Sequence, residues 1–302
     1  MERRLIAALP ALAGLWLLAT PAAAAEKQSL LWEKMKARVL AVDQDLDGVL
    51  GVSVKDLSSG QAFELRPTEP FPTASSIKLA VLYELYRQAE DGKLFLNEVT
   101  RPGPVRVGGG GVLQELGDAV SLSWRDLATL MMGWSDNEAT NLLIDKVGLD
   151  NVNRRLDALG LPNTRLRRKM MDLDAARQGR ENTSSPSELR RLAETVYGGT
   201  ALSPAGAKDI RALAALPKDS PFRLPLPASL PVLDKPGALE GVRCVGAVVD
   251  LPKRPYSVAI MTAYLKKDED GEKAIQQISA ILYQTFDRLA RSSDLGRVIS
   301  EK

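Results

Sequence analysis

The sequence predicts an α/β (α+β) fold, because two hydrophobic patterns divide the 302 residues between them. Strand-like segments lie near both ends, over 49–65 and over 243–265. Between them, apolar residues recur with helical spacing. The simplest packing is an α/β lobe built from residues 26–66 and 216–295, with an all-α lobe, residues 67–215, inserted between them.

The composition is that of an ordinary globular protein, 45% hydrophobic and 26% charged. A net charge of +2, from 40 basic and 38 acidic residues, gives no argument for binding nucleic acid. One cysteine and no histidine exclude an internal disulfide, Ser-His-Asp or Cys-His catalysis and the usual zinc sites. We expect no metal and no cofactor, so that acid–base chemistry falls to lysine, aspartate, glutamate or tyrosine.

Residues 1–25 have the pattern of a secretory signal peptide. Arg3 and Arg4 precede an apolar run over 5–19, and a stretch of small residues ends at Ala25. The run is too short for a comfortable membrane span, although an uncleaved anchor is the alternative. We expect cleavage after Ala25, no stable membrane insertion afterwards, and a periplasmic or secreted protein with a single domain over 26–302.

The first expected elements are a helix, a hairpin and a buried helix. Two strand-like segments, 49–57 and 61–65, are joined by a turn at 58–60. Residues 76–89 are apolar on nearly every side, which indicates a buried helix. The opening helix, 29–42, is expected to place one set of residues on a single side: Leu30, Leu31, Met35, Val39 and Leu40.

Shorter helices are expected through the middle of the chain, at 122–134, 137–147 and 151–159. Ser185 to Glu188 reads as a capping box with proline at the first helical position, and Ser203-Pro204 opens another helix in the same way. Strands follow at 243–251 and 256–265. The last helix is expected to bury Ile275, Ile278, Leu282, Phe286 and Leu289.

Ser75 and Lys78 form the first candidate catalytic motif, at the start of the predicted buried helix. A hydroxyl there lies at the positive end of the helix dipole, and the lysine lies one turn away on the same face. A lysine in a partly desolvated pocket loses its proton and can act as a base. The structural alternative is a capping serine and a surface charge, but a helix that is apolar all round is an odd place for a surface lysine.

Two other triplets have stronger structural alternatives. Ser135-Asp136-Asn137 lies between two helices, where Ser135 and Glu138 read as a capping box. Lys235-Pro236-Gly237 precedes the strand at 243–251 and reads by itself as a Pro-Gly turn. Its functional alternative is a positive charge beside a glycine that lets a substrate approach the backbone closely.

Taken together, S-x-x-K, S-D-N and K-x-G in this order resemble the motif set of the penicillin-recognising serine enzymes. The sequence resembles the class A β-lactamase family over nearly the whole mature chain, and the separations between the motifs match. The stretches that carry the resemblance beyond the triplets are 66–75, 111–113, 127–131 and 137–143.

The resemblance implies a β-lactamase/transpeptidase-like fold, with an antiparallel sheet flanked by helices from both termini, and acyl transfer as the chemistry. Neutral Lys78 would take the proton of Ser75, and Ser135 would protonate the leaving nitrogen with Lys235 beside it. The backbone N–H groups of Ser75 and Ala238 would form the oxyanion hole. The residues expected to bind substrate are Asn137, Gly237, Ala238 and Arg243.

The sequence departs from the family where its β-lactamases carry the glutamate that activates the deacylating water, in the form R-x-x-x-x-E-x-x-L-N. By the register of Arg165, the glutamate position falls on Met170 and the asparagine position on Asp174. Methionine cannot take a proton, and Asp172 or Asp174 would replace the base only if the loop folded differently. Acylation followed by slow deacylation is therefore expected.

A second departure is Pro236, where the family usually has a threonine or serine whose hydroxyl helps to hold the substrate carboxylate. Proline also lacks a backbone donor. Arg243, one residue out of the family's register, is the remaining candidate for a cation near that carboxylate.

Three functions stay open at this point. The first is a class A β-lactamase-like serine hydrolase, slow to deacylate. The second is a D-Ala-D-Ala peptidase or penicillin-binding protein of cell-wall metabolism, and the third is a non-catalytic binder of wall peptides. The expected partner is accordingly a small β-lactam or a peptidoglycan stem peptide, with no nucleic acid, and we expect a monomer.

Overall fold

A computed structural model describes residues 21–103, 106–117, 119–293 and 295–299. Its centre is a five-stranded sheet of order β2-β1-β9-β8-β7, in which every neighbouring pair is antiparallel. The predicted mixed fold with an antiparallel sheet is confirmed. The strands are β1 Val49–Asp56, β2 Ala62–Leu65, β7 Val232–Leu239, β8 Val242–Val249 and β9 Tyr256–Ala263.

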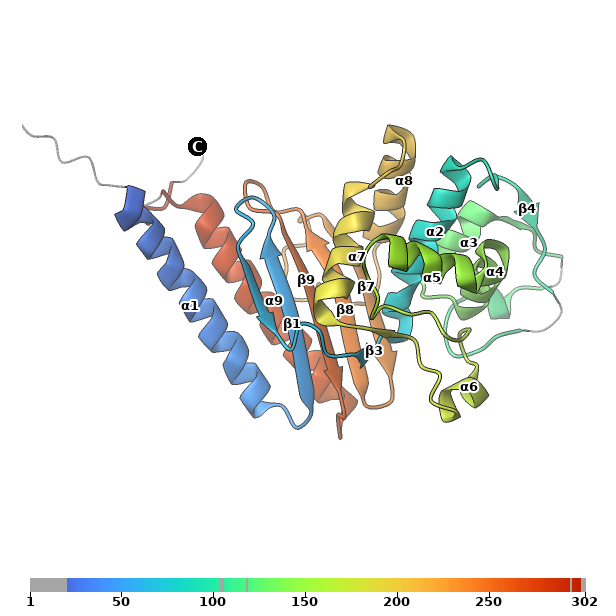
Figure 1. Cartoon of the computed structure of the whole chain (residues 1–302), viewed down its shortest axis with the longest axis horizontal. Helices are drawn as coiled ribbons and strands as arrows, with labels where there is room; N and C mark the ends of the chain where they lie inside the picture. The colour runs from blue at the N-terminus through green and yellow to red at the C-terminus, as the bar shows by residue number, and fades with distance from the viewer. Residues whose placement is uncertain (1–20, 104–105, 118, 294, 300–302) are drawn as a thin grey trace, which may run out of the picture.

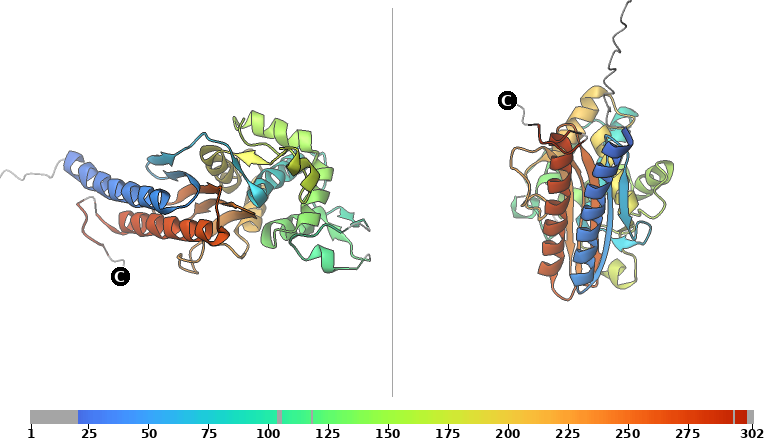
Figure 2. Two further views of the ribbon diagram at one scale, coloured as in Figure 1. Left: turned by 90° about the horizontal axis from the view of Figure 1, so that it is seen from below. Right: turned by 90° about the vertical axis from the view of Figure 1, so that its left-hand side faces the viewer.

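Two helices from opposite ends of the chain, α1 (Pro21–Asp45) and α9 (Asp268–Arg291), lie side by side over one face of the sheet (Figures 1 and 2). The ring of Phe286 on α9 stacks on Tyr256 at 4.3 Å and meets Trp32 edge-on at 5.7 Å. The face predicted for α1 is partly wrong: Leu30 and Leu40 are 58% and 40% exposed, while Trp32 is buried. The five apolar residues predicted for the last helix are all buried.

The other face of the sheet is covered by α7 (Pro186–Gly198), which joins it to the helical part of the molecule (Figure 1). The buried helix predicted over 76–89 is α2 (Lys78–Glu90). A 3₁₀ turn, η1 (Ala74–Ile77), precedes it. The other helices are α3 Trp124–Gly133, α4 Asn137–Val147, α5 Leu149–Ala158, α6 Leu173–Arg177 and α8 Pro204–Ala215. Short elements complete the order: β3 Phe71–Pro72, β4 Val99–Thr100, η2 Leu113–Glu115, β5 Leu122–Ser123 and β6 Thr183–Ser184.

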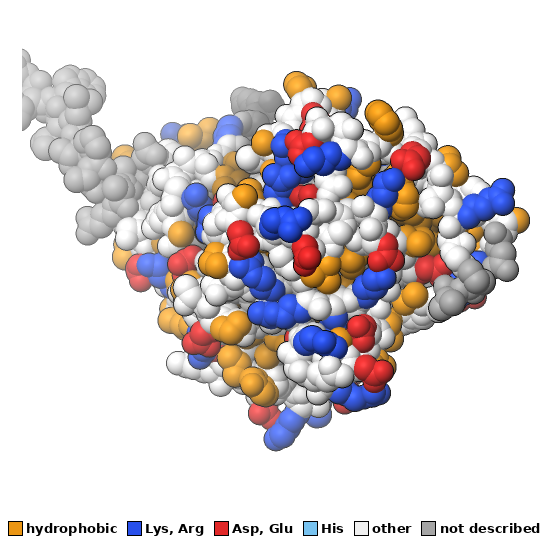
Figure 3. All heavy atoms as spheres, turned by 45° about the vertical axis from the view of Figure 1, so that its right-hand side comes forward, with side chains coloured by type: hydrophobic (Ala, Val, Ile, Leu, Met, Phe, Trp, Pro, Cys, Tyr) orange, Lys and Arg blue, Asp and Glu red, His pale blue; other side chains and the backbone are white. Residues whose placement is uncertain are grey.

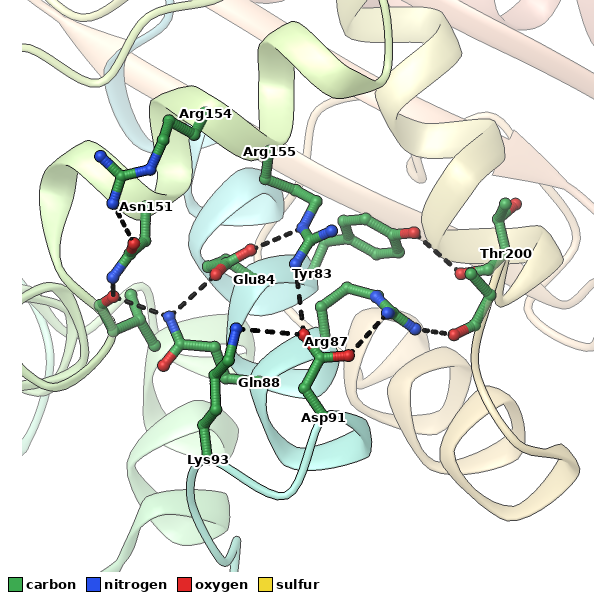
Figure 4. Close-up of polar contacts among 12 residues, drawn as sticks. Tyr83, Glu84, Arg87, Gln88, Asp91, Lys93, Asn151, Arg154, Arg155 and Thr200 are labelled. Carbon is green, nitrogen blue, oxygen red and sulfur yellow. Dashed lines mark hydrogen bonds and ion pairs between the residues drawn. The ribbon is translucent and has the colours of Figure 1, made fainter.

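Polar contacts fix the C-terminal half of α2 between its neighbours (Figure 4). Buried Glu84 pairs with Arg155 of α5 at 2.8 Å, and Tyr83 donates to the carbonyl oxygen of Thr200 at 2.8 Å. Gln88 donates both to Glu84 and to the last carbonyl of α4. Because α2 is held on several sides, the residues at its N-terminus have a fixed position.

Two local predictions are wrong. Ser185 is the N-cap of α7, but its hydroxyl makes no capping bond, and Glu188 accepts hydrogen bonds from the backbone of Asn163 and Thr164 instead of closing a capping box. Residues 235–237 form part of strand β7 rather than a Pro-Gly turn. A proline is tolerated there because β7 is an edge strand, where a missing N–H need not break a ladder.

The surface mixes both signs of charge (Figure 3). Lysine and arginine side chains lie among aspartate and glutamate over the face shown, with no broad area of one sign. Among the described residues, no helix combines the length and hydrophobicity that crossing a membrane requires. Of the predicted signal peptide, residues 1–20 lie outside the described part of the chain.

Candidate active site

The two neighbouring serines of η1 have different surroundings. Ser75 lines a cleft of about 770 Å³, whereas Ser76 is fully buried and its hydroxyl donates to the carbonyl oxygen of Lys235 at 2.8 Å. Ala74, directly before Ser75, has a φ of +44°, a region that non-glycine residues seldom adopt. Strain of this kind gathers at functional sites, and here it turns Ser75 toward the cleft.

Lys78 begins α2 and is fully buried, so it is not a surface charge. Its Nζ donates to the carbonyl oxygen of Ser135 at 2.6 Å, to Ser135 Oγ at 3.0 Å and to Asn137 Oδ1 at 3.0 Å. Burial, with the nearby positive charge of Lys235, holds the pKa of Lys78 well below its usual 10.5, although Asp136 acts in the opposite direction. No hydrogen bond joins Lys78 to Ser75 among the described residues, and such contacts often tighten only when substrate binds.

Ser135 brings the two lysines together. Lys78 and Lys235 both donate to its Oγ, each at 3.0 Å. A hydroxyl has two lone pairs and one proton. With both lone pairs occupied, the proton of Ser135 is directed away from the lysines, and Ser135 lines the cleft. Its φ of +53° is a second left-handed conformation at this site.

Asp136, not Ser135, caps α4, so the predicted capping box is wrong. The Asp136 carboxylate accepts from the N–H of Ala139 at 2.8 Å, and it also accepts from the N–H groups of Val112 and Leu113 at 2.8 and 2.7 Å. The other predicted member of the box, Glu138, pairs with Arg106 at 3.0 Å. The Ser135 hydroxyl is thereby left to the two lysines.

Four consecutive glycines, residues 108–111, form one rim of the cleft and are held against α4. The Asn137 amide donates to the carbonyl oxygen of Gly108 at 3.1 Å, while its Oδ1 accepts from Lys78. Gly111 has a φ of +102°, and a Cβ there would lie 2.3 Å from the Asp136 carboxyl group. Only glycine fits this approach.

Lys235 lies on β7, the edge strand beside η1, and is buried. Burial, with neighbouring Lys218, lowers the pKa of Lys235 from 10.5 to about 7, and Asp234 opposes this shift. Two residues on, a Cβ at Gly237 would lie 2.6 Å from the carbonyl oxygen of Thr73. Gly237 therefore allows β7 to pack against the turn that carries Ser75. Ala238 is exposed and lines the cleft.

Met170, at the position where the family's β-lactamases carry the deacylating glutamate, lines the cleft. Its N–H donates to Asn141 Oδ1 at 2.8 Å and its carbonyl oxygen accepts from Asn141 Nδ2 at 3.1 Å, so α4 fixes this residue. Asp172 caps α6 and Asp174 pairs with Arg177, and neither is among the described residues that line the cleft.

Arg243 lines the cleft but is paired with two acidic residues in the first turns of α9. Its guanidinium contacts Glu272 at 3.0 Å and Asp268 at 3.1 Å. Its Nη1 donates to the carbonyl oxygens of Leu239 and Val242. Sequence reasoning missed these partners, and also Lys218 and Asn141, because no motif spacing links them to the site.

The fold, the cleft serine Ser75, and Ser135 with its two buried lysines define a serine hydrolase that acts on amide bonds. A profile of the β-lactamase enzyme family matches residues 31–286, and the chain belongs to that family, as a class A β-lactamase-like serine hydrolase. The resemblance inferred from the motifs is confirmed.

Several relatives are similar along most of their length. β-Lactamase PSE-4 of Pseudomonas aeruginosa is 26% identical over 275 residues, 86% of this chain and 93% of that one. An imipenem-hydrolysing β-lactamase of Enterobacter cloacae is 27% identical over 165 residues, and this match spans 54% of this chain and 56% of that enzyme.

Two solved structures have closely similar folds. A β-lactamase of Sphaerobacter thermophilus superposes with a TM-score of 0.76 at 28% identity, over 85% of this chain and 98% of that one. PBP-A superposes with a TM-score of 0.77 at 25% identity, over 84% and 96%.

Proposed function

We propose that this protein forms an acyl-enzyme at Ser75 with β-lactams and releases it slowly. The observation that carries the proposal is the convergence of Lys78 and Lys235 on Ser135 beside the cleft that Ser75 lines. The names of relatives support the substrate class, since PSE-4 is a β-lactamase and a PBP-A variant has been solved as an acyl-enzyme complex with penicillin G.

Acylation needs three proton transfers. In its neutral form Lys78 gives up one of its three hydrogen bonds and takes the proton of Ser75 as the Ser75 Oγ–carbon bond forms. The backbone N–H groups of Ser75 and Ala238 hold the oxyanion. The C–N bond then breaks as Ser135 gives its proton to the leaving nitrogen. Ser135 is reprotonated by Lys78 across their 3.0 Å contact, so one proton passes in total from Ser75 to the leaving group. Asn137 would orient the acyl side chain.

Release of the acyl group lacks an evident base. The ester would lie near Met170, which carries no group that can accept a proton from water. A general base contributes about 10²–10⁴-fold to such a step, and we therefore infer a long-lived acyl-enzyme.

The direct test combines a chromogenic cephalosporin assay with intact-mass measurement on the mature protein. We expect a burst close to one equivalent, a slow steady state and one covalent adduct. The absence of both burst and adduct would reject acylation by β-lactams and would favour a non-catalytic binder.

Changing Met170 to glutamate is expected to shorten the life of the acyl-enzyme by at least about tenfold, because it restores a carboxylate near the ester. Decay of the adduct after removal of free penicillin measures this. Asp172→Asn and Asp174→Asn serve as controls and should leave the decay unchanged. A wild-type turnover typical of good hydrolases, lost in one of these two variants, would show that the aspartate concerned is the base.

A peptidase of D-Ala-D-Ala stems is the second candidate. The methionine at position 170 favours it, since related penicillin-binding proteins also lack the glutamate, and PBP-A is among the structural neighbours. A stem peptide would be acylated by the same steps. Release of D-alanine from a synthetic stem peptide, dependent on Ser75, is the measurement that distinguishes this substrate.

We also propose that residues 1–25 direct export and that the mature protein, from residue 26, acts as a monomer in the periplasm or outside the cell. Within the mature domain, the α/β lobe would comprise 26–66 and 216–295, and the all-α lobe 67–215. N-terminal sequencing of the exported protein and its mass in solution test these statements.

Replacing Pro236 by threonine is expected to speed acylation by carboxylate-bearing β-lactams by about ten- to a hundredfold. The change adds a hydroxyl and an N–H beside the cleft, and a hydrogen bond to a charged group is worth roughly 1.5–3 kcal/mol. Acylation rates for a penicillin and for an ester substrate without a carboxylate are compared. If both substrates respond equally, or neither does, Pro236 does not lie at a carboxylate site.

A further inference from the structure

We propose that this site selects acyl donors whose leaving-group side carries no carboxylate, namely uncharged amides or esters. The proposal rests on the acyl-enzyme function above and defines its substrate class. It argues against the peptidase candidate, because the D-alanine released from a stem peptide carries a carboxylate. In the proposed mechanism the leaving group lies beside Ser135 and Lys235. A carboxylate attached to the leaving group therefore needs a cation near the edge of β7. The cations there are Lys235, Arg243 and Lys218.

Arg243 is already neutralised by protein groups. Three of its five N–H groups donate hydrogen bonds, one to the Glu272 carboxylate and two to backbone carbonyls. Its Nη2 also forms an ion pair with Asp268 at 3.1 Å. One cation between two carboxylates leaves a local charge of −1. The guanidinium is only 13% exposed, whereas Glu272 and Asp268 are 40% and 37% exposed. Glu272 lines the cleft together with Arg243, so an incoming carboxylate would meet this anion beside the cation.

Lys218 lines the cleft, but protein groups already occupy its ammonium group. Its Nζ donates to the carbonyl oxygens of Ala214 and Asp234 at 2.7 and 3.0 Å, and its side chain is 3% exposed. Asp234, fully buried, is shared with Arg223 at 2.7 Å. These contacts leave almost none of the Lys218 side chain exposed for a ligand.

Lys235 is the remaining cation, and it is committed to Ser135 Oγ and to the carbonyl oxygen of Pro236. Burial lowers the pKa of Lys235 to about 7, which weakens its positive charge relative to that of an ordinary lysine. Pro236 adds no hydroxyl and no N–H. Moving a carboxylate from water into such surroundings costs several kcal/mol unless it is paired.

The rest of the cleft suits an apolar donor. Four large hydrophobic side chains that line it are well exposed: Trp134 at 55%, Met171 at 44%, Leu173 at 52% and Leu224 at 69%. An uncharged substrate gains by covering this surface, and the gain requires no counter-ion.

The test compares benzylpenicillin with its methyl ester, which differ only in the carboxylate. The rate of adduct formation on the wild-type protein is followed by intact mass. We expect the ester to acylate Ser75 faster than the acid. Acylation by the acid at an equal or higher rate would overturn the proposal while leaving β-lactam acylation intact. No adduct with either probe would reject both the proposal and β-lactam acylation.

A charge variant provides the second arm. Glu272→Gln removes one of the two anions on Arg243 and should speed acylation by the acid about tenfold, with no change for the ester. Glu269→Gln is the matched control, since Glu269 is an exposed residue on the same helix, outside the cleft lining. It should change neither rate. Equal responses of acid and ester to Glu272→Gln would contradict the proposed role of the Arg243 pairing.

Discussion

Ser75→Ala is expected to abolish the covalent penicillin adduct, whereas Ser76→Ala should retain it. Ser75 lines the cleft, while the hydroxyl of Ser76 is turned inward onto the carbonyl oxygen of Lys235 and the thiol of Cys244. A serine without access to the cleft cannot attack a carbonyl there. Intact-mass measurement after incubation with penicillin distinguishes the two variants in a single experiment.

Thermal unfolding provides the control for this pair. Ser76→Ala removes a buried hydrogen bond, worth about 1 kcal/mol, and should lower the melting temperature more than Ser75→Ala does. An adduct that persists in Ser75→Ala would place the nucleophile elsewhere. Loss of the adduct in Ser76→Ala with normal melting would contradict the purely structural role of Ser76.

Local sequence patterns predicted the helices well where caps and periodicity agreed. The prediction for α4, Asn137–Val147 ended by Gly148, matches the structure residue for residue. The apolar 76–89 segment was predicted as a buried helix, and α2 is one. Both signals depend on residues within a few turns of one another, and no distant contact overrides them.

Strand β7 was missed because its sequence contains a proline and a glycine, which ordinarily mark a turn. Both are tolerated for reasons that lie elsewhere in the chain. Pro236 lies on a sheet edge, and Gly237 is packed against Thr73 and Cys244. Long-range pairing with β8 therefore decided the conformation, and a local pattern carries no record of it.

The composition of the site could be predicted, but the state of its charges could not. The three motifs identified Ser75, Lys78, Ser135 and Lys235, and the structure brings the last three into contact. The pairing of Arg243 with Glu272 joins residues 29 positions apart. Nothing in the sequence around Arg243 indicates it, although this pairing determines whether the arginine is free for a substrate.

Lys78→Ala is expected to slow acylation by more than about a hundredfold, the usual scale for loss of a general base. Burial and Lys235 hold the pKa of Lys78 well below 10.5, so its neutral form persists to lower pH than that of an ordinary lysine. Wild-type acylation should therefore persist to lower pH than an ordinary lysine base would allow, and it should fall as Lys78 becomes protonated. In the alanine variant, the acylation rate should be low and should no longer show this fall with pH.

Quenched-flow acylation rates across the pH range, with intact mass as readout, measure both effects. Lys266→Ala is the matched control, because that side chain is 81% exposed and its only charged neighbour within 4 Å among the described residues is Asp47. It should leave the rate and the profile unchanged. Circular dichroism must show that Lys78→Ala is folded, since the variant removes a buried side chain with three hydrogen bonds. A folded Lys78→Ala protein that is acylated at the wild-type rate would exclude Lys78 as the base and would direct attention to Lys235.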